Sequence, residues 1–210
     1  MPDTLSSVMA FGGGDDRVRS GTAIPGDAPG DPGVWVFICA DMCAFAVFFL
    51  LFAVGRIGNP QLYAQSSRQL DLGLGLANTL ILLTSGAFMA RATRSARGAD
   101  KAATQRNLLL ALGIGSLFAL TKAVEWQAKL AHGVGLTTNE FFTYYFIFTG
   151  IHFLHFVIGI AVLAVLIARV RNRPLDADAR RWIEAGGAYW HMVDLLWIVL
   201  FAMLYLLRGA

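Results

Sequence analysis

The chain has 210 residues, of which 56% are hydrophobic and 15% are charged, and its mean hydropathy is +0.57. Soluble domains usually carry about a quarter charged residues, so this composition excludes an ordinary soluble protein and indicates one that crosses a membrane several times. The net charge of +3 at pH 7 reflects basic residues gathered on one side of that membrane, and it requires no nucleic-acid partner.

The first 32 residues differ from the rest of the chain. The stretch "FGGGDDRVRSGTAIPGDAPGDPG" is rich in Gly, Asp and Pro and has few large apolar side chains. It cannot bury enough surface to offset the entropy of ordering, so we expect residues 1–32 to form a disordered tail. The tail lacks the charged start and apolar core of a signal peptide, so the first apolar stretch is expected to insert and remain.

Five apolar stretches then follow within residues 33–210, the expected membrane domain. Each is long enough to span as a helix, which takes about 20 residues. They cover residues 34–54, 70–92, 107–130, 140–168 and 187–207. Their hydrophobicity is continuous rather than alternating, so the sequence predicts an all-α bundle of five transmembrane helices and not a closed barrel.

The first stretch combines a carboxylate with a largely apolar surface. Asp41 lies inside it, followed by the run "FAVFFLLF", which suits contact with lipid or a partner helix. Cys39 and Cys43 share a helix face, but two cysteines in one apolar run resemble neither a disulfide framework nor a zinc site. We interpret them as small apolar side chains.

The second and third stretches are rich in residues that let helices approach closely. The expected packing positions there are Gly75, Asn78, Gly86 and Gly113. Asn78 can also form a hydrogen bond across a helix interface. The third stretch carries Lys122 and Glu125, which are spaced i, i+3 and therefore share a face. They are expected to form an intramembrane ion pair, with Lys122 extending outward toward the interface.

The last two stretches hold three of the four histidines. Tyr144 and Tyr145 begin the fourth stretch and suit the headgroup region. His152 and His155 follow at i, i+3, between two further expected packing positions, Gly150 and Gly159. The fifth stretch, "AYWHMVDLLWIVLFAMLYLL", contains His191 and Asp194 at the same spacing.

Basic residues predict the orientation of the bundle. Twelve Lys or Arg residues fall in the tail and in the two connections on its side, against four on the opposite side. The positive-inside rule therefore places the N-terminus in the cytoplasm and the C-terminus outside. From this orientation and a rise of about 1.5 Å per residue, Asp41 and Asp194 lie about 12 Å from the cytoplasmic side, where they could share a layer with His191.

Three functions remain open for the ionisable residues inside the spans. They could form a buried polar framework that holds helices together. His152, His155 and His191 with a carboxylate could instead form a metal or haem site, although the Glu-x-x-His motif of di-iron bundles is absent from the sequence. A small transporter would predict an internal repeat with broken helices, and no such repeat is visible.

Several motifs, in order along the chain, resemble subunit III of haem-copper oxidases. "YWHMVDLLWIVLF" is similar to that family's last helix, and "TGIHFLHFVIG" to the helix before it. "KAVEW", "NTLILLTSG" and "CADMCAFAVFF" are similar to its preceding helices, so the resemblance covers about residues 33–207. In that family the carboxylate at the position of Asp41 is usually a Glu and reacts with carbodiimides.

The resemblance implies a non-catalytic subunit in the bacterial inner membrane. Such a subunit has no redox centre or other cofactor of its own, binds phospholipid, packs against the catalytic subunit and supports its proton uptake and turnover. Asp41, Lys122, Glu125, His152, His155, His191 and Asp194 would be its buried polar framework, in contact with lipid or partner. Mitochondrial members have seven helices, and the two that are missing from the five expected here form one wall of that family's lipid cleft. The compact length, "FFTYYFIFTG" and "WHMVDLLW" are closer to the E-type accessory proteins of nitric oxide reductase.

Overall fold

The computed structural model describes residues 32–207, so the predicted tail lies outside the described residues except for its last position. Within the described range the chain is helical and contains no strand. The elements are α1 (Pro32–Gly58), α2 (Pro60–Arg68), α3 (Leu72–Arg97), α4 (Lys101–Ala131), α5 (Glu140–Asn172), α6 (Ala177–Phe201) and a π-helical turn, η1 (Ala202–Leu206), that continues α6.

Within residues 32–207, five helical segments are long and apolar enough to cross a membrane, which confirms the five predicted spans. They run longer than the apolar stretches, because hydropathy marks only the part of a helix that lies in hydrocarbon. The connection between α3 and α4 shrinks to residues 98–100, where the Asp100 side chain accepts a hydrogen bond from the Ala103 backbone N–H. Asp176 caps α6 in the same way through Ala179, so α6 begins at Ala177, ten residues before the predicted start of that span.

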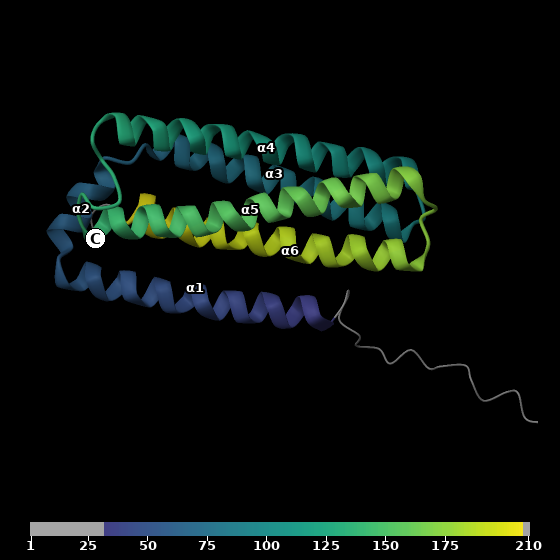
Figure 1. Ribbon diagram of the computed structural model, residues 1–210, viewed down its shortest axis with the longest axis horizontal. Coiled ribbons are helices and arrows are strands. Elements are labelled where there is room, and N and C mark those ends of the chain that lie inside the picture. The colour runs from purple at the N-terminus through teal and green to yellow at the C-terminus, as the bar shows by residue number, and fades with distance from the viewer. Residues whose placement is uncertain (1–31, 208–210) are drawn as a thin grey trace, which may run out of the picture.

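The short helix α2 lies outside every predicted element because its sequence, "PQLYAQSSR", is polar. Its Tyr63 is buried between the rings of Phe52 and Phe141, with ring centroids 5.1 and 5.7 Å away. Burial, together with the nearby Glu140 carboxylate, raises the pKa of the Tyr63 hydroxyl, so this side chain stays neutral. The helix covers one end of the bundle, beside the C-terminal end of the described chain (Figure 1).

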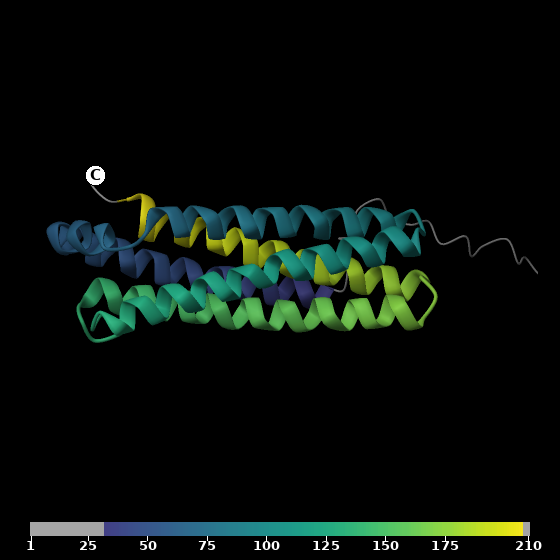
Figure 2. The ribbon, with the colours of Figure 1, turned by 90° about the horizontal axis from the view of Figure 1, so that it is seen from above.

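The helices differ greatly in how much of their surface is covered. In Figure 1, α3 and α4 lie together on one side, α5 and α6 lie in the middle, and α1 runs along the other side. In the view from above, α3 and α5 run along opposite edges and α1 lies behind the other helices (Figure 2). The central helix α6 buries large side chains, including Trp190 and Trp197, each 0% exposed. In contrast, Leu50 of α1 is 67% exposed and Ile57 is 80% exposed, so much of α1 faces away from the chain.

Glycines mark the closest helix contacts. A Cβ added to Gly159 would lie 2.9 Å from the Trp190 ring, and one added to Gly75 would lie 2.8 Å from the Tyr205 ring. A Cβ on Gly86 would collide with the Asp194 carboxylate. The expected close approach does not occur at the other two predicted glycines, Gly113 and Gly150, because an added Cβ would meet no atom within 4 Å.

Candidate functional site: buried polar clusters within the bundle

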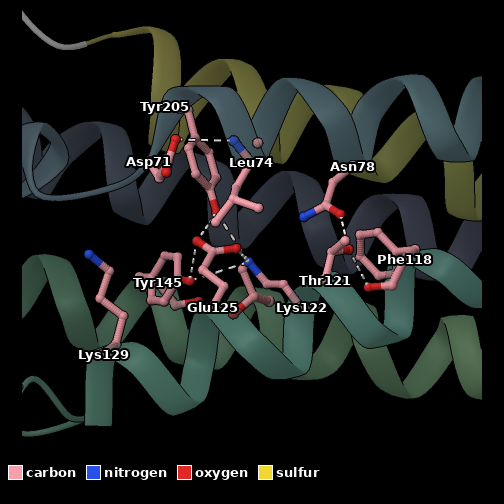
Figure 3. A network of polar contacts seen from close by, with 12 residues as sticks. Asp71, Leu74, Asn78, Phe118, Thr121, Lys122, Glu125, Lys129, Tyr145 and Tyr205 are labelled. Carbon is pink, nitrogen blue, oxygen red and sulfur yellow. Dashed lines mark hydrogen bonds and ion pairs between the residues drawn. The ribbon is translucent and has the colours of Figure 1, made fainter. Parts of the chain in front are cut away.

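The predicted pair of Lys122 and Glu125 forms the centre of a buried network (Figure 3). The Nζ atom of Lys122 lies 3.0 Å from Oε2 of Glu125. The same ammonium donates to the hydroxyl oxygens of Tyr145, at 3.3 Å, and Tyr205, at 3.1 Å. Both hydroxyls donate in turn to Oε1 of Glu125, at 2.8 Å from Tyr145 and 2.6 Å from Tyr205.

This network satisfies the hydrogen-bonding capacity of its charged members. An ammonium group has three N–H donors, and Lys122 directs them to three different acceptors. Its charge also lies over the ring of Trp197, 5.1 Å from the centroid. Lys122 is 0% exposed and Glu125 is 3% exposed, so each charge is neutralised inside the protein rather than by water.

The structure corrects two sequence expectations at this network. Lys122 points into the bundle and does not extend outward, because the Tyr145 and Tyr205 hydroxyls and the Trp197 ring surround its ammonium. Tyr145 is fully buried and directs its hydroxyl to Lys122 and Glu125 rather than to lipid headgroups, whereas its neighbour Tyr144 is partly exposed. Hydropathy alone could not distinguish the two, since only the rotation of α5 decides which tyrosine faces α4.

The π-helical turn η1 brings the last member into the network. The Leu207 backbone N–H donates to the Ala202 carbonyl, five residues earlier, where an α-helix would bond four residues back. Within this widened turn Tyr205 is fully buried and reaches Glu125 on α4. The network therefore joins three elements: α4, α5 and the end of the last span.

A second polar pair joins α1 to α5. Nε2 of His155 lies 3.1 Å from Oδ1 of Asp41, and the two side chains are 12% and 13% exposed. Nδ1 of the same ring lies 2.8 Å from the Ile151 carbonyl oxygen. The ring of Phe45 contacts the imidazole edge-on, at 5.8 Å between centroids.

These contacts determine the proton count of the pair. The Ile151 carbonyl can only accept a hydrogen bond, so Nδ1 must be the donor there. The contact between His155 and Asp41 then contains one proton, carried either by Nε2 of an imidazolium or by the Asp41 carboxyl. Both arrangements are neutral overall, which suits a site inside a membrane span.

The third pair is His191 and Asp194 on α6, with Nδ1 and Oδ2 3.7 Å apart. Asp194 is buried against Gly86 of α3, and its Oδ1 atom has no hydrogen-bond partner. The His191 side chain is 48% exposed, far more than that of Asp194 at 7%. This pair therefore opens toward the surface of the bundle, unlike the network around Lys122.

The remaining histidine of the spans, His152, lies in an aromatic environment. It is 0% exposed, and its ring contacts those of Phe118 and Trp197 at 5.6 and 5.3 Å between centroids. Neither ring nitrogen has a hydrogen-bond partner. His152 thus faces α4 and α6, whereas His155, three residues later, faces α1.

The structure separates residues that sequence spacing allowed to meet. His152, His155 and His191 have different neighbours, and within residues 32–207 no three His, Cys, Asp or Glu side chains form a group suited to a metal ion. Asp41 pairs with His155 of α5 and not with the predicted layer of Asp194 and His191. The reason is rotational: Asp194 faces α3, while Asp41 faces α5.

The amino-acid sequence that forms these clusters is similar to that of a known protein family. The sequence profile of the family described as "Cytochrome c oxidase subunit III" matches residues 31–208. The chain belongs to the cytochrome c oxidase subunit III family. This confirms the family predicted from the motifs, and subunit III is a non-catalytic subunit of haem-copper oxidases that associates with the catalytic subunits.

Relatives in this family come from several kinds of oxidase. Cytochrome c oxidase subunit 3 of Synechocystis is 29% identical over 195 residues, which cover 89% of this chain and 82% of the relative. Cytochrome bo(3) ubiquinol oxidase subunit 3 of Pseudomonas aeruginosa is 28% identical over 179 residues and 83% of each chain. In Aeropyrum pernix, a haem-copper oxidase subunit I+III is 29% identical over 180 residues, covering 82% of this chain and 22% of that longer protein.

Proposed function

We propose that this chain is a non-catalytic membrane subunit that stabilises the catalytic subunit of a respiratory haem-copper oxidase or nitric oxide reductase and supports its turnover and proton uptake. The family match over residues 31–208 carries this proposal. The structure supports a framework role, because Lys122 and Glu125 make their hydrogen bonds inside the chain and tie three elements together.

The fused relative supports direct contact with the catalytic subunit. Its name places subunits I and III in one polypeptide, and this chain aligns with part of it. In that protein the two units are covalently joined. For this chain we infer that the same neighbours meet through contacts between helices within the membrane.

Within the family, we favour the branch of accessory proteins that act beside nitric oxide reductase. The support is the likeness of the stretches "FFTYYFIFTG" and "WHMVDLLW" to proteins of that branch. Relatives from cytochrome c and ubiquinol oxidases are about equally similar to the chain, at 29% and 28% identity, so overall similarity does not choose between electron donors.

The proposed setting is the bacterial inner membrane, with the N-terminus in the cytoplasm. The basic residues of the connections between α3 and α4 and between α5 and α6 support this orientation, since both connections lie at the end of the bundle where α1 begins (Figure 1). The exposed apolar face of α5 also suits bound phospholipid, which we propose as the protein's lipid partner.

The test is purification of the tagged chain from native membranes in mild detergent, followed by mass spectrometry and a visible spectrum. We expect a catalytic haem-copper subunit to co-purify in a fixed ratio, and its identity names the branch. Deletion of the chain should then lower oxygen or nitric oxide reduction by those membranes. A chain that purifies alone with its own haem band or stoichiometric metal would overturn the proposal.

A further inference from the structure

A groove between α1 and α6 exposes a polar side chain in an otherwise apolar surface. Its volume is about 310 Å³. The walls and floor are formed by Trp35, Ile38 and Met42 of α1 and by Ala188, His191 and Leu195 of α6. Since both helices are membrane spans, the groove faces either lipid or another protein and not bulk water.

His191 is exposed to a degree that sets it apart from the other ionisable residues discussed inside the spans. Its side chain is 48% exposed, compared with 13% for Asp41, 12% for His155 and 7% for Asp194. A polar ring in hydrocarbon loses its hydrogen bonds to water, so such residues normally face the interior of an assembly. The exposure of His191 within residues 32–207 therefore indicates that this ring meets a partner beyond the described part of the chain.

The Asp194 carboxylate lies on the Nδ1 side of this imidazole, with Oδ2 3.7 Å from Nδ1, and is held against Gly86 of α3. This distance is longer than a hydrogen bond, so the carboxylate attracts a protonated ring without fixing its tautomer. The opposite nitrogen, Nε2, lies on the far side of the ring from Asp194 and is the atom that we expect to meet a neighbouring molecule at the groove.

The shape and chemistry of the groove fit a helix better than an acyl chain. An acyl chain would fill apolar space but would leave the imidazole without a hydrogen bond. A helix can cover Ile38, Met42 and Leu195 with apolar side chains and supply one polar side chain to His191. Ala188, which also lines the groove, is small and permits a close approach.

We propose that the α1–α6 groove is the docking site for a transmembrane helix of the catalytic subunit, and that this helix presents a hydrogen-bonding side chain to His191. The inference rests on the proposed function, which supplies the partner, and adds the surface by which that partner is bound. It also accounts for the sparse covering of α1, which would pack against its own chain on one side and against the partner on the other.

Site-specific photo-crosslinking tests the surface. A benzoylphenylalanine is placed at Trp35 or Leu195 in the groove, and, as matched controls, at Leu120 of α4 or Val165 of α5, each of which is 64% exposed. Native membranes holding the full complex are irradiated, and adducts are identified by mass and peptide mapping. We expect adducts with the catalytic subunit at both groove positions and at neither control position.

A second arm tests the histidine. His191→Leu should lower the yield of co-purified catalytic subunit at least several-fold, His191→Gln should restore part of it, and His132→Leu in the α4–α5 connection should leave it unchanged. Adducts only at the control positions, adducts only with a second copy of this chain or with lipid, or full binding by His191→Leu would each overturn the inference. If the unmodified chain captures no catalytic subunit, the proposed function fails instead.

Discussion

At the scale of single residues, the buried charges are stable only as a group. Lys122 donates to three acceptors and Glu125 accepts from three donors. Every one of these hydrogen bonds joins two of the four residues Lys122, Glu125, Tyr145 and Tyr205. Removal of one member therefore leaves another without a partner in a site that water does not reach. This mutual dependence makes the size of a substitution's effect predictable.

Lys122→Met should lower the free energy of unfolding by about 3–5 kcal/mol, because it leaves the Glu125 carboxylate buried without a cation. The double variant Lys122→Met with Glu125→Met should be more stable than Lys122→Met alone, since it removes both charges. Thermal unfolding in detergent measures the difference, with Lys101→Met, at an exposed position, as the control. A double variant less stable than either single one would contradict this account of the pair.

Tyr205→Phe keeps the ring but removes the hydroxyl that bridges Lys122 and Glu125. The loss of one acceptor and one donor should cost about 1–3 kcal/mol of stability, which the same unfolding measurement would detect. Tyr144→Phe provides the control, because the Tyr144 side chain is only partly buried and lies outside the network. Equal effects of the two substitutions would show that the hydroxyl of Tyr205 has no special role.

Asp41 is the carboxyl group that we expect to react with dicyclohexylcarbodiimide. The reagent dissolves in the membrane and attacks protonated carboxyl groups, and Asp41 shares one proton with His155 at 13% exposure. The Glu125 side chain, enclosed at 2% exposure, should stay unmodified. Peptide mapping by mass spectrometry checks this, and Asp41→Asn should abolish the adduct while keeping the contact with His155. An adduct on Glu125 would mean that the network opens in the membrane.

At the scale of elements, the sequence predicted the existence of the spans better than their ends or rotations. Long apolar stretches mark where hydrocarbon surrounds a helix, and all five of these stretches became helices. The ends depend on capping side chains such as Asp100 and Asp176, which lie beyond the apolar stretches. The polar helix α2 gave no hydropathy signal, although Pro60 at its start is typical of a first turn.

The candidate site was predictable in its members and unpredictable in its contacts. The spacing i, i+3 placed Lys122 beside Glu125, and the structure has them paired. The same spacing placed His152 beside His155, yet the two rings face different helices. Tyr145 and Tyr205 could not be assigned to the network from the sequence, because their contacts depend on the rotation of α5 and on a π-helical turn.

Glycine contacts between helices can be tested with a matched pair. Gly159→Ala should destabilise the bundle by about 1–3 kcal/mol, because its Cβ would lie 2.9 Å from the Trp190 ring. Gly113→Ala should be neutral or stabilising by up to about 1 kcal/mol, since it meets no atom within 4 Å and Ala favours a helix. Thermal unfolding of the two variants compares them, and a Gly113→Ala variant that unfolds as early as Gly159→Ala would contradict the packing argument.

At the scale of the whole molecule, the bundle has two unlike ends. The connections between α3 and α4 and between α5 and α6 lie at the end where α1 begins, and α2 lies at the other (Figure 1). Most of the Lys and Arg residues that flank the spans lie at the end where α1 begins. The charge asymmetry that predicted the orientation therefore corresponds to one physical end of the molecule.

The orientation predicts which connections a membrane-impermeant maleimide reaches from outside the cell. With Cys39 and Cys43 replaced by Ala, Gly135→Cys between α4 and α5 should be labelled in intact cells. Ala99→Cys between α3 and α4 should be labelled only after the cells are opened. The reverse pattern would place the N-terminus outside and contradict the proposed topology.

The π-helical turn makes the Lys122 network depend on backbone conformation as well as on residue identity. Such a turn holds one residue more than the α-helical turn it replaces, so it sets the direction in which Tyr205 leaves the helix and reaches Glu125. If the same residues formed an α-helical turn, each would advance by about 100° around the axis, and Tyr205 would point in a different direction. The network could therefore lose a member without any substitution.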